Sequence, residues 1–134
     1  MKTLLKLLFL VALTLNVASA NDRTLLATTS INDLKERDVL KLSNCEGNRN
    51  AKTTHLKIKV NRYRIDLYKL KVTFQNGDTQ ELYARKHFKK GSTSEWLELV
   101  GGPRCVRKIS ITADANILGL GLRKKAHVSF YGKK

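Results

Sequence analysis

The sequence predicts a single antiparallel β-sandwich of about eight short strands, held by one disulfide and containing minimal helix. Three observations point to this fold class. Apolar and polar residues alternate with a period of two through the middle of the chain, as in strands with one face on a core and one in water. Turn signals recur roughly every ten residues. The chain contains only two cysteines.

The first twenty residues are predicted to be a cleaved secretory signal peptide. Lys2 and Lys6 flank the start of an apolar run from Leu4 to Leu15, and Ala18-Ser19-Ala20 has the small-x-small cleavage pattern. A membrane anchor would need roughly 18 or more consecutive apolar residues, and Lys6 and Asn16 interrupt the run. We therefore expect a signal peptide over residues 1–20 and one soluble β-sandwich domain over residues 21–134, in the periplasm or secreted beyond it.

The predicted mature domain is strongly basic. It keeps all eleven acidic residues and all but two of the twenty-six basic ones, which leaves a net charge of +13. Such a charge steers a protein towards anionic surfaces and carries no information about its fold. A solubility device without any partner is the alternative interpretation.

Two short strands are expected first, over Leu25 to Ser30 and Val39 to Leu42, with Ile31 to Arg37 able to form a helical turn between them. Alternation then predicts three consecutive strands, and their inward residues fall into three sets: Leu56-Ile58-Val60, Tyr63-Ile65-Leu67 and Leu70-Val72-Phe74.

The clearest hairpin signal is Asn76-Gly77, which predicts a type I′ turn with positive φ at both residues. Five further segments complete the prediction. They are a return strand over Thr79 to Ala84, a charged loop over Arg85 to Ser94, and strands over Trp96 to Leu99, Cys105 to Thr112 and Ala126 to Tyr131. Val100 to Pro103 reads as a turn, and the glycine-rich run Asn116 to Leu122 as a buried bend.

Cys45 and Cys105 are predicted to form one intramolecular disulfide, because an even cysteine count in a small exported domain favours a bridge. The bridge would close a loop of 61 residues, which contributes about 4 kcal/mol on the chain-entropy model. A metal site or a catalytic thiol would need a CxxC or nearby histidines, and His55, His87 and His127 are widely scattered.

Enzymatic motifs are sparse, and the sequence predicts a protein that is not an enzyme and takes no cofactor or metal. No G-x-S-x-G elbow, H-E-x-x-H spacing or glycine-rich phosphate loop is present. Asp66, Glu95 and Glu98 lie in strand-like context and are expected to pair with neighbouring cations.

Basic residues concentrate in two groups that are candidates for anion binding. The first would form one wide positive sheet face and contains Lys57, Lys59, Arg62, Arg64, Lys69 and Lys71. The second lies in the charged loop and contains Arg85, Lys86, Lys89 and Lys90. Tyr83, His87, Phe88 and Tyr131 are the aromatic platforms that a nucleic-acid interface would want. A solvated lysine-rich face is the simpler interpretation.

Several short motifs resemble the YaaI-like group, small exported proteobacterial proteins with a domain of unknown function (family 2541). They are Leu25-Leu26-Ala27, the lone Cys45, Leu70-x-Val72-x-Phe74 before Asn76-Gly77, Gly91-x-Thr93-Ser94-x-Trp96, and Arg104-Cys105-Val106-x-Lys108-Ile109. This chain departs from the group by its load of lysine and arginine. The resemblance implies a compact periplasmic β domain with one disulfide and assigns no activity.

The sequence thus favours a binding module that contacts an anionic envelope polymer or lipid headgroups. Nucleic acid is a weaker candidate, because export places the protein beside the envelope. The alternative is an accessory or inhibitor protein that binds a protein partner through loops at one end of the sandwich.

Overall fold

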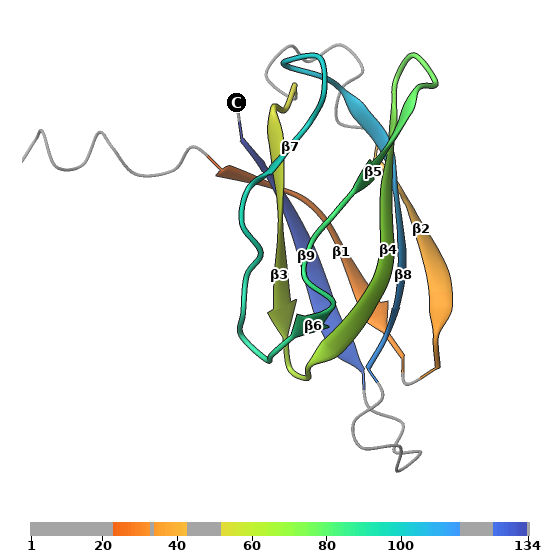
Figure 1. Ribbon diagram of the computed structural model, residues 1–134, viewed down its shortest axis with the longest axis vertical. Coiled ribbons are helices and arrows are strands. Elements are labelled where there is room, and N and C mark those ends of the chain that lie inside the picture. The colour runs from red at the N-terminus through yellow and green to blue at the C-terminus, as the bar shows by residue number, and fades with distance from the viewer. Residues whose placement is uncertain (1–22, 33, 43–51, 116–124, 134) are drawn as a thin grey trace, which may run out of the picture.

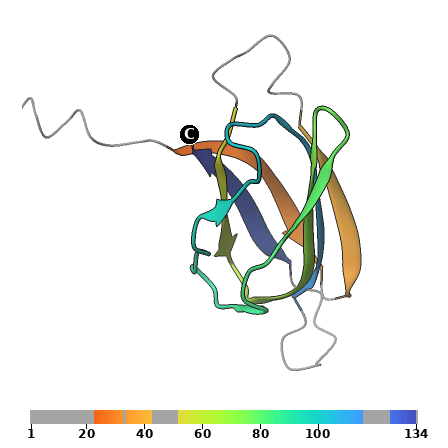
Figure 2. The same cartoon turned by 45° about the horizontal axis from the view of Figure 1, so that its top comes forward.

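The computed structural model describes residues 23–32, 34–42, 52–115 and 125–133, and this part of the chain contains strands and no helix. Nine strands form two antiparallel sheets (Figure 1). The prediction of an all-β chain is confirmed, with one strand more than expected. The two sheets face each other across a single core, the arrangement of a β-sandwich (Figure 2).

The first sheet has the strand order β1-β9-β3-β7. Its strands are β1 (Arg23–Ile31), β9 (Ala126–Lys133), β3 (His55–Asn61) and β7 (Leu97–Glu98). The second sheet has the order β2-β8-β4-β5, and β6 pairs separately with β4. Its strands are β2 (Glu36–Lys41), β8 (Val106–Asp114), β4 (Ile65–Phe74), β5 (Thr79–Leu82) and β6 (His87–Phe88). Most connections between consecutive strands therefore cross from one sheet to the other.

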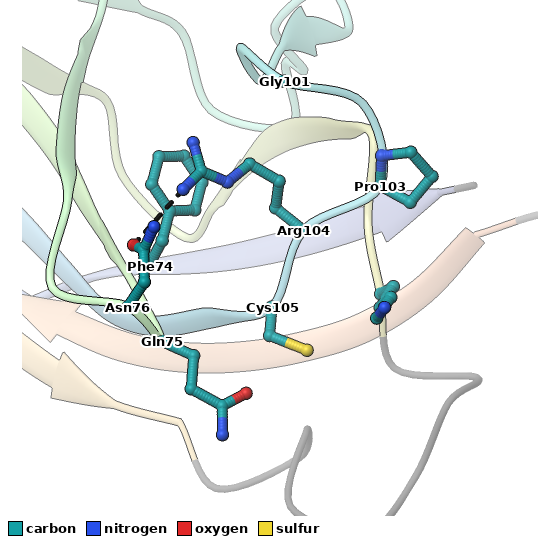
Figure 3. A pocket seen from close by; sticks show the side chains of 8 residues that line it. Phe74, Gln75, Asn76, Gly101, Pro103, Arg104 and Cys105 are labelled. Atoms are coloured by element: carbon teal, nitrogen blue, oxygen red, sulfur yellow. Dashed lines mark hydrogen bonds between the residues drawn. The ribbon is translucent and has the colours of Figure 1, made fainter.

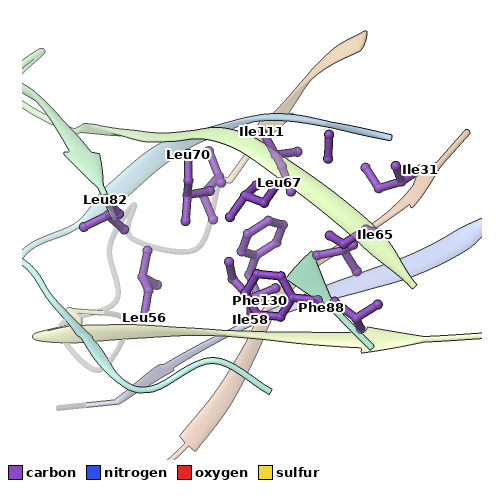
Figure 4. Packing of buried hydrophobic residues seen from close by; sticks show 14 of the residues in the cluster. Ile31, Leu56, Ile58, Ile65, Leu67, Leu70, Leu82, Phe88, Ile111 and Phe130 are labelled. Atoms are coloured by element: carbon purple, nitrogen blue, oxygen red, sulfur yellow. The ribbon is translucent and has the colours of Figure 1, made fainter. Parts of the chain in front are cut away.

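The core is built by the inward residues of the alternating strands (Figure 4). Leu56, Ile58 and Val60 of β3 are fully buried, as the alternation predicts. They pack in the same cluster as Leu70 and Val72 of β4. Burial of such side chains contributes roughly 1.5–3 kcal/mol each relative to exposure, which is why the period-2 pattern determines which face of each strand turns inward.

Two of the three predicted consecutive strands are one strand. β4 runs without a break from Ile65 to Phe74, and its register on β8 shifts between Leu67 and Lys69. Tyr68 is the extra residue of a β-bulge, so the buried positions change phase from Leu67 to Leu70. The change in the alternation pattern was predicted to mark a strand boundary, but it arises from the bulge inside one continuous strand.

The hairpin after β4 is confirmed, but the predicted turn type is wrong. Among the described non-glycine residues only Arg62 has positive φ, so Asn76 does not take the left-handed conformation that a type I′ turn requires. The Gly77 N–H instead donates to the Phe74 carbonyl at 3.0 Å. Of the three loop residues, only Gly77 has positive φ, +94°. This is the three-residue hairpin loop in which a type I turn is followed by a left-handed glycine.

Two further local expectations are corrected. The helical turn over Ile31 to Arg37 is absent from the described residues there, because buried Ile31 ends β1 opposite Ala126 and Glu36 already begins β2. The loop over Arg85 to Ser94 contains the short strand β6, since Phe88 is buried and pairs with Ile65.

Several predictions fall outside the described residues. They are the signal peptide over residues 1–20, Cys45, and the bend over Asn116 to Leu122. Cys105 lies directly before β8 and is not a free thiol. Its pairing with Cys45 stays a prediction.

Candidate anion-binding surface

The predicted wide positive face is divided between opposite sides of the molecule. Lys57 and Lys59 lie on the outer side of β3 in the first sheet, whereas Lys69 and Lys71 lie on β4 in the second sheet. They were predicted to lie together because their strands are consecutive in the sequence. Since β3 and β4 belong to different sheets, their outward residues point in opposite directions.

Five of the six remaining predicted cations form a third group at one end of the sandwich. Arg62 and Arg64 are exposed in the connection from β3 to β4. Lys89 and Lys90 lie close to them, because the next residue, Gly91, donates its N–H to the Val60 carbonyl at 2.7 Å. Arg85 lies beside them, since its guanidinium donates to the Thr93 carbonyl at 2.7 Å, whereas the Lys86 ammonium lies 5.1 Å from the centre of the Tyr68 ring on the second sheet. The ten predicted residues thus occupy three separate surfaces.

Trp96 is the aromatic residue that distinguishes one of these surfaces. The segment that carries it is fixed on β3 by Ser94, whose N–H donates to the Ile58 carbonyl at 2.8 Å and whose Oγ accepts from the Ile58 N–H at 2.9 Å. Leu97 then pairs with Leu56. Because side chains alternate along a strand, Trp96 lies on the outer side of the sheet beside Lys57.

Four cations surround Trp96 and Tyr131 on this outer side. The ammonium groups of Lys57 and Lys133 lie 4.5 and 4.7 Å from the centre of the Trp96 ring. The Arg23 guanidinium lies 5.1 Å from the centre of the Tyr131 ring. Tyr131 is the cross-strand partner of Lys57, and Lys59 follows two residues along β3. We call Arg23, Lys57, Lys59, Trp96, Tyr131 and Lys133 the Trp96 face.

The lysines of the Trp96 face have no acidic partner in the part of the chain that the structure describes. Among the described residues, the ion pairs are His87 with Asp66 and Arg104 with Asp78. Glu98 lies opposite His55 in the β3–β7 strand pairing at the edge of this sheet. Its side chain is exposed and is not within ion-pair distance of any of these lysines. Two ammonium groups near one indole repel each other, and each cation–π contact offsets only about 0.5–1 kcal/mol at an exposed site. A bound anion would relieve this repulsion.

The second sheet carries a different polar cluster, around Tyr68. The Tyr68 hydroxyl donates to Asp114 Oδ2 at 2.7 Å, and this hydrogen bond, with desolvation and the neighbouring carboxylates, raises the pKa of Tyr68 to about 12. His87 Nδ1 lies 2.6 Å from Asp66 Oδ1, and Asp66 is the cross-strand partner of Asp114. Lys35 and Lys86 lie over the Tyr68 ring. Cations here are balanced by two aspartates, unlike those of the Trp96 face.

A pocket of about 420 Å³ lies beside Arg104, between the β4–β5 turn and the turn before β8 (Figure 3). The Arg104 guanidinium lies 3.7 Å from the centre of the Phe74 ring and donates to the Val100 carbonyl at 3.1 Å and to Asn76 Oδ1 at 3.3 Å. These internal contacts occupy much of its hydrogen-bonding capacity. Arg104 therefore ties two turns together and is not a candidate ligand-binding group.

The three histidines do not meet. His55 lies near one end of β3, and His127 pairs with Asn61 at the other end, roughly 20 Å away at the rise of a strand. His87 belongs to the second sheet. Among the described residues, no group of three or more His, Cys, Asp or Glu side chains could hold a metal ion. In the same part of the chain, no helix is long and apolar enough to span a membrane.

Sequence reasoning missed the members of the Trp96 face that come from the two ends of the domain. Arg23, Trp96 and Lys133 were not among the predicted anion-binding residues, and Tyr131 was considered only as a stacking platform. The alternation in Ala126 to Tyr131 does indicate that Tyr131 points outward. That β9 lies between β1 and β3 depends on the pairing of distant strands, which local pattern does not reveal.

The fold and this surface define a small all-β domain with a cationic, aromatic sheet face. The chain matches the family described as Domain of unknown function (DUF2541) over residues 3–132, nearly its whole length, and belongs to that family. No curated protein matches it.

A chain from the structural and functional characterization of Pseudomonas aeruginosa AlgX is similar to it, with a TM-score of 0.47 and 10% sequence identity. The match covers 87% of the present chain and 28% of the AlgX chain.

Proposed function

We propose that this protein is a non-enzymatic binding module that contacts an anionic component of the cell envelope through the Trp96 face. The observation that carries the proposal is the position of the Lys57 and Lys133 ammonium groups, 4.5 and 4.7 Å from one indole ring, with no described carboxylate in ion-pair distance. Unpaired surface cations that are held near each other attract polyanions by simple charge.

Export and a Cys45–Cys105 disulfide belong to the same proposal. The predicted signal peptide supports a location outside the cytoplasm, and Cys105 is not a free thiol. The protein recovered from an exporting cell should have the mass of residues 21–134 less two hydrogens, and gain those two hydrogens on reduction. An unprocessed chain, or two free thiols in the exported protein, would contradict this part of the proposal.

The division of lysines between the two sheets provides a matched experiment. Lys57→Glu with Lys59→Glu, and Lys69→Glu with Lys71→Glu, make the same change in net charge on opposite faces. In sedimentation with isolated envelope fragments at low salt, we expect the first pair to weaken binding at least about tenfold. The second pair should weaken it about twofold or less, because exposed charges that do not touch the ligand act only at long range.

Two results would contradict the proposal. Equal losses in the two double variants would mean that net charge, rather than the Trp96 face, causes retention. Retention that does not weaken up to about 0.5 M salt, where screening is nearly complete at contact distances, would exclude the electrostatic mechanism. A salt-resistant complex of fixed stoichiometry would instead favour binding to a protein partner.

A further inference from the structure

We infer that the ligand of the Trp96 face is an acidic polysaccharide, a chain of sugar rings that carry carboxylate or sulfate groups. This inference rests on the proposed function and adds the chemical class of the ligand. Three kinds of side chain share the outer side of the first sheet, and each kind matches one part of such a chain.

Aromatic rings are the first kind. Tyr131 on β9, Lys57 on β3 and Trp96 beside β7 form one row across neighbouring strands, because Tyr131 pairs with Lys57 and Leu97 pairs with Leu56. Two strand spacings separate the rings by about 10 Å. That separation is comparable to the length of two pyranose rings in an extended chain. The negative face of an aromatic ring attracts the partly positive C–H groups on one side of a sugar.

Cations beside each ring are the second kind. Arg23 lies against Tyr131, while Lys57 and Lys133 lie against Trp96. A sugar ring stacked on either aromatic residue would therefore have a positive group next to it. A carboxylate or sulfate on that sugar could accept a charge-assisted hydrogen bond, which is about twice as strong as a neutral one.

Neutral polar groups are the third kind, and they separate a sugar ligand from other polyanions. Thr28 and Ser30 on β1, Asn61 on β3 and His127 on β9 lie on the same outer side of the sheet. Hydroxyl, amide and imidazole groups both donate and accept hydrogen bonds, as sugar hydroxyls do. A phosphate polymer offers only acceptors and would make little use of the acceptor groups of this surface.

The surface lacks the features that insertion into a lipid layer requires. Binding to an anionic membrane combines cations with apolar side chains that enter the headgroup region. Leu25 is the one large apolar side chain in the described strands of this sheet that is exposed on its outer side. Lys57, Lys59, Trp96, Tyr131 and Lys133 are only half-exposed, so they lie along the sheet and leave it smooth.

Trp96 provides a direct readout, because it is the only tryptophan of the chain. We expect polygalacturonate and dextran sulfate to change the fluorescence of the wild-type protein in a saturable way at low salt. Neutral dextran should cause a much weaker change. By calorimetry, Trp96→Ala should weaken binding of polygalacturonate about tenfold or more, as for other central aromatic anchors. Trp96→Phe should retain affinity within about threefold, since it keeps a stacking ring.

Tyr68→Ala is the matched aromatic control, since Tyr68 is 38% exposed and lies on β4 in the opposite sheet. It should leave the affinity for polygalacturonate unchanged. The melting temperature of each variant identifies any loss due to unfolding, and Trp96→Phe then carries the comparison.

Polyphosphate, single-stranded DNA and phosphatidylglycerol vesicles test the other ligand classes. If polyphosphate or DNA bound as tightly as polygalacturonate and lost the same factor on Trp96→Ala, the sugar inference would be wrong and the proposed anion-binding face would stand. Binding to vesicles but not to soluble polymers would replace the polysaccharide with a membrane. Failure of every polyanion to bind would overturn the proposed function itself.

Discussion

Arg62 adopts a conformation that is costly for any residue with a side chain. Its φ is +70°, and the Tyr63 N–H donates to the Asn61 carbonyl at 2.9 Å, which closes a γ-turn around it. This tight turn takes the chain from the end of β3 in the first sheet towards β4 in the second. A left-handed residue costs about 1–2 kcal/mol unless it is glycine.

Arg62→Gly should therefore leave the protein as stable as the wild type or raise its free energy of unfolding by up to about 1 kcal/mol. Glycine removes the left-handed strain but adds roughly 0.5–1 kcal/mol of backbone entropy to the unfolded chain. Arg64→Gly is the control: it removes the same charge where φ is not positive, and should destabilise the protein. Urea denaturation of both variants measures the difference, and equal destabilisation would show that Arg62 is not strained.

Tyr68 should ionise at a higher pH than an ordinary tyrosine. Its pKa is raised from 10.0 to about 12, chiefly by the hydrogen bond to Asp114. A raised pKa in the folded state means that the proton is held more tightly there, so this contribution to stability is fully present below pH 10 and is lost as the pH rises towards 12.

An ultraviolet titration of tyrosinate should show one late phase in the wild type, and Tyr68→Phe should abolish that phase. A titration in which Tyr68→Phe removed an early phase would contradict the hydrogen bond.

Among the elements, β9 contains a glycine that has no room for a side chain. Gly132 lies within this strand, and an added Cβ would be 2.8 Å from Thr53 Oγ1, 2.9 Å from Thr53 Cγ2 and 3.0 Å from Leu26 Cδ1. Thr53 is itself buried. Its backbone pairs with Arg104, so it cannot move away easily.

Gly132→Ala should lower the free energy of unfolding by about 1–3 kcal/mol through overpacking. Because Thr53 supplies the two nearest atoms, the loss in the double variant Gly132→Ala with Thr53→Ala should be smaller than the sum of the two single losses. Chemical denaturation of the four proteins completes this double-mutant cycle. Strict additivity would show that the contact with Thr53 is not the cause.

The motifs that carry the family resemblance have identifiable structural roles. In Gly91-x-Thr93-Ser94-x-Trp96, Gly91 has positive φ, Ser94 bonds to β3, and Trp96 is thereby presented on the outer side of the sheet. Arg104 connects two turns before β8. The motif from Gly91 to Trp96 therefore positions an aromatic ring of the candidate site, and the motif that begins at Arg104 stabilises the fold.

Strands with regular alternation could be predicted from the sequence, and the rest could not, for identifiable reasons. Leu56, Ile58 and Val60 alternate strictly, and β3 has the predicted inward face. The β4 bulge at Tyr68 changes the phase of the pattern without ending the strand. Asn76-Gly77 predicted a type I′ turn. The structure has a type I turn followed by Gly77 instead, because the hairpin closes at Phe74 and Asp78 around three residues.

For the whole molecule, the cations predicted to bind anions divide over two outer sheet faces and one end. Alternation predicts correctly that the lysines point outward, but which lysines share a surface depends on the order of the strands. Lys57 and Tyr131 are far apart in sequence and adjacent in space, whereas Lys59 and Lys69 are close in sequence and lie on opposite sheets. The candidate site is therefore a property of topology more than of composition.

Gln80 joins the two sheets at the side where β5 and β7 lie. Its Nε2 donates to the Glu98 carbonyl at 3.1 Å, and its Oε1 accepts from the Val100 N–H at 2.9 Å. These backbone groups form the side of β7 that faces away from β3, and one amide side chain occupies both of them. An uncovered sheet edge of this kind can pair with a strand of a neighbouring molecule, which leads to aggregation. Gln80 thereby leaves the Glu98 carbonyl and the Val100 N–H unavailable for pairing with a strand of a second molecule.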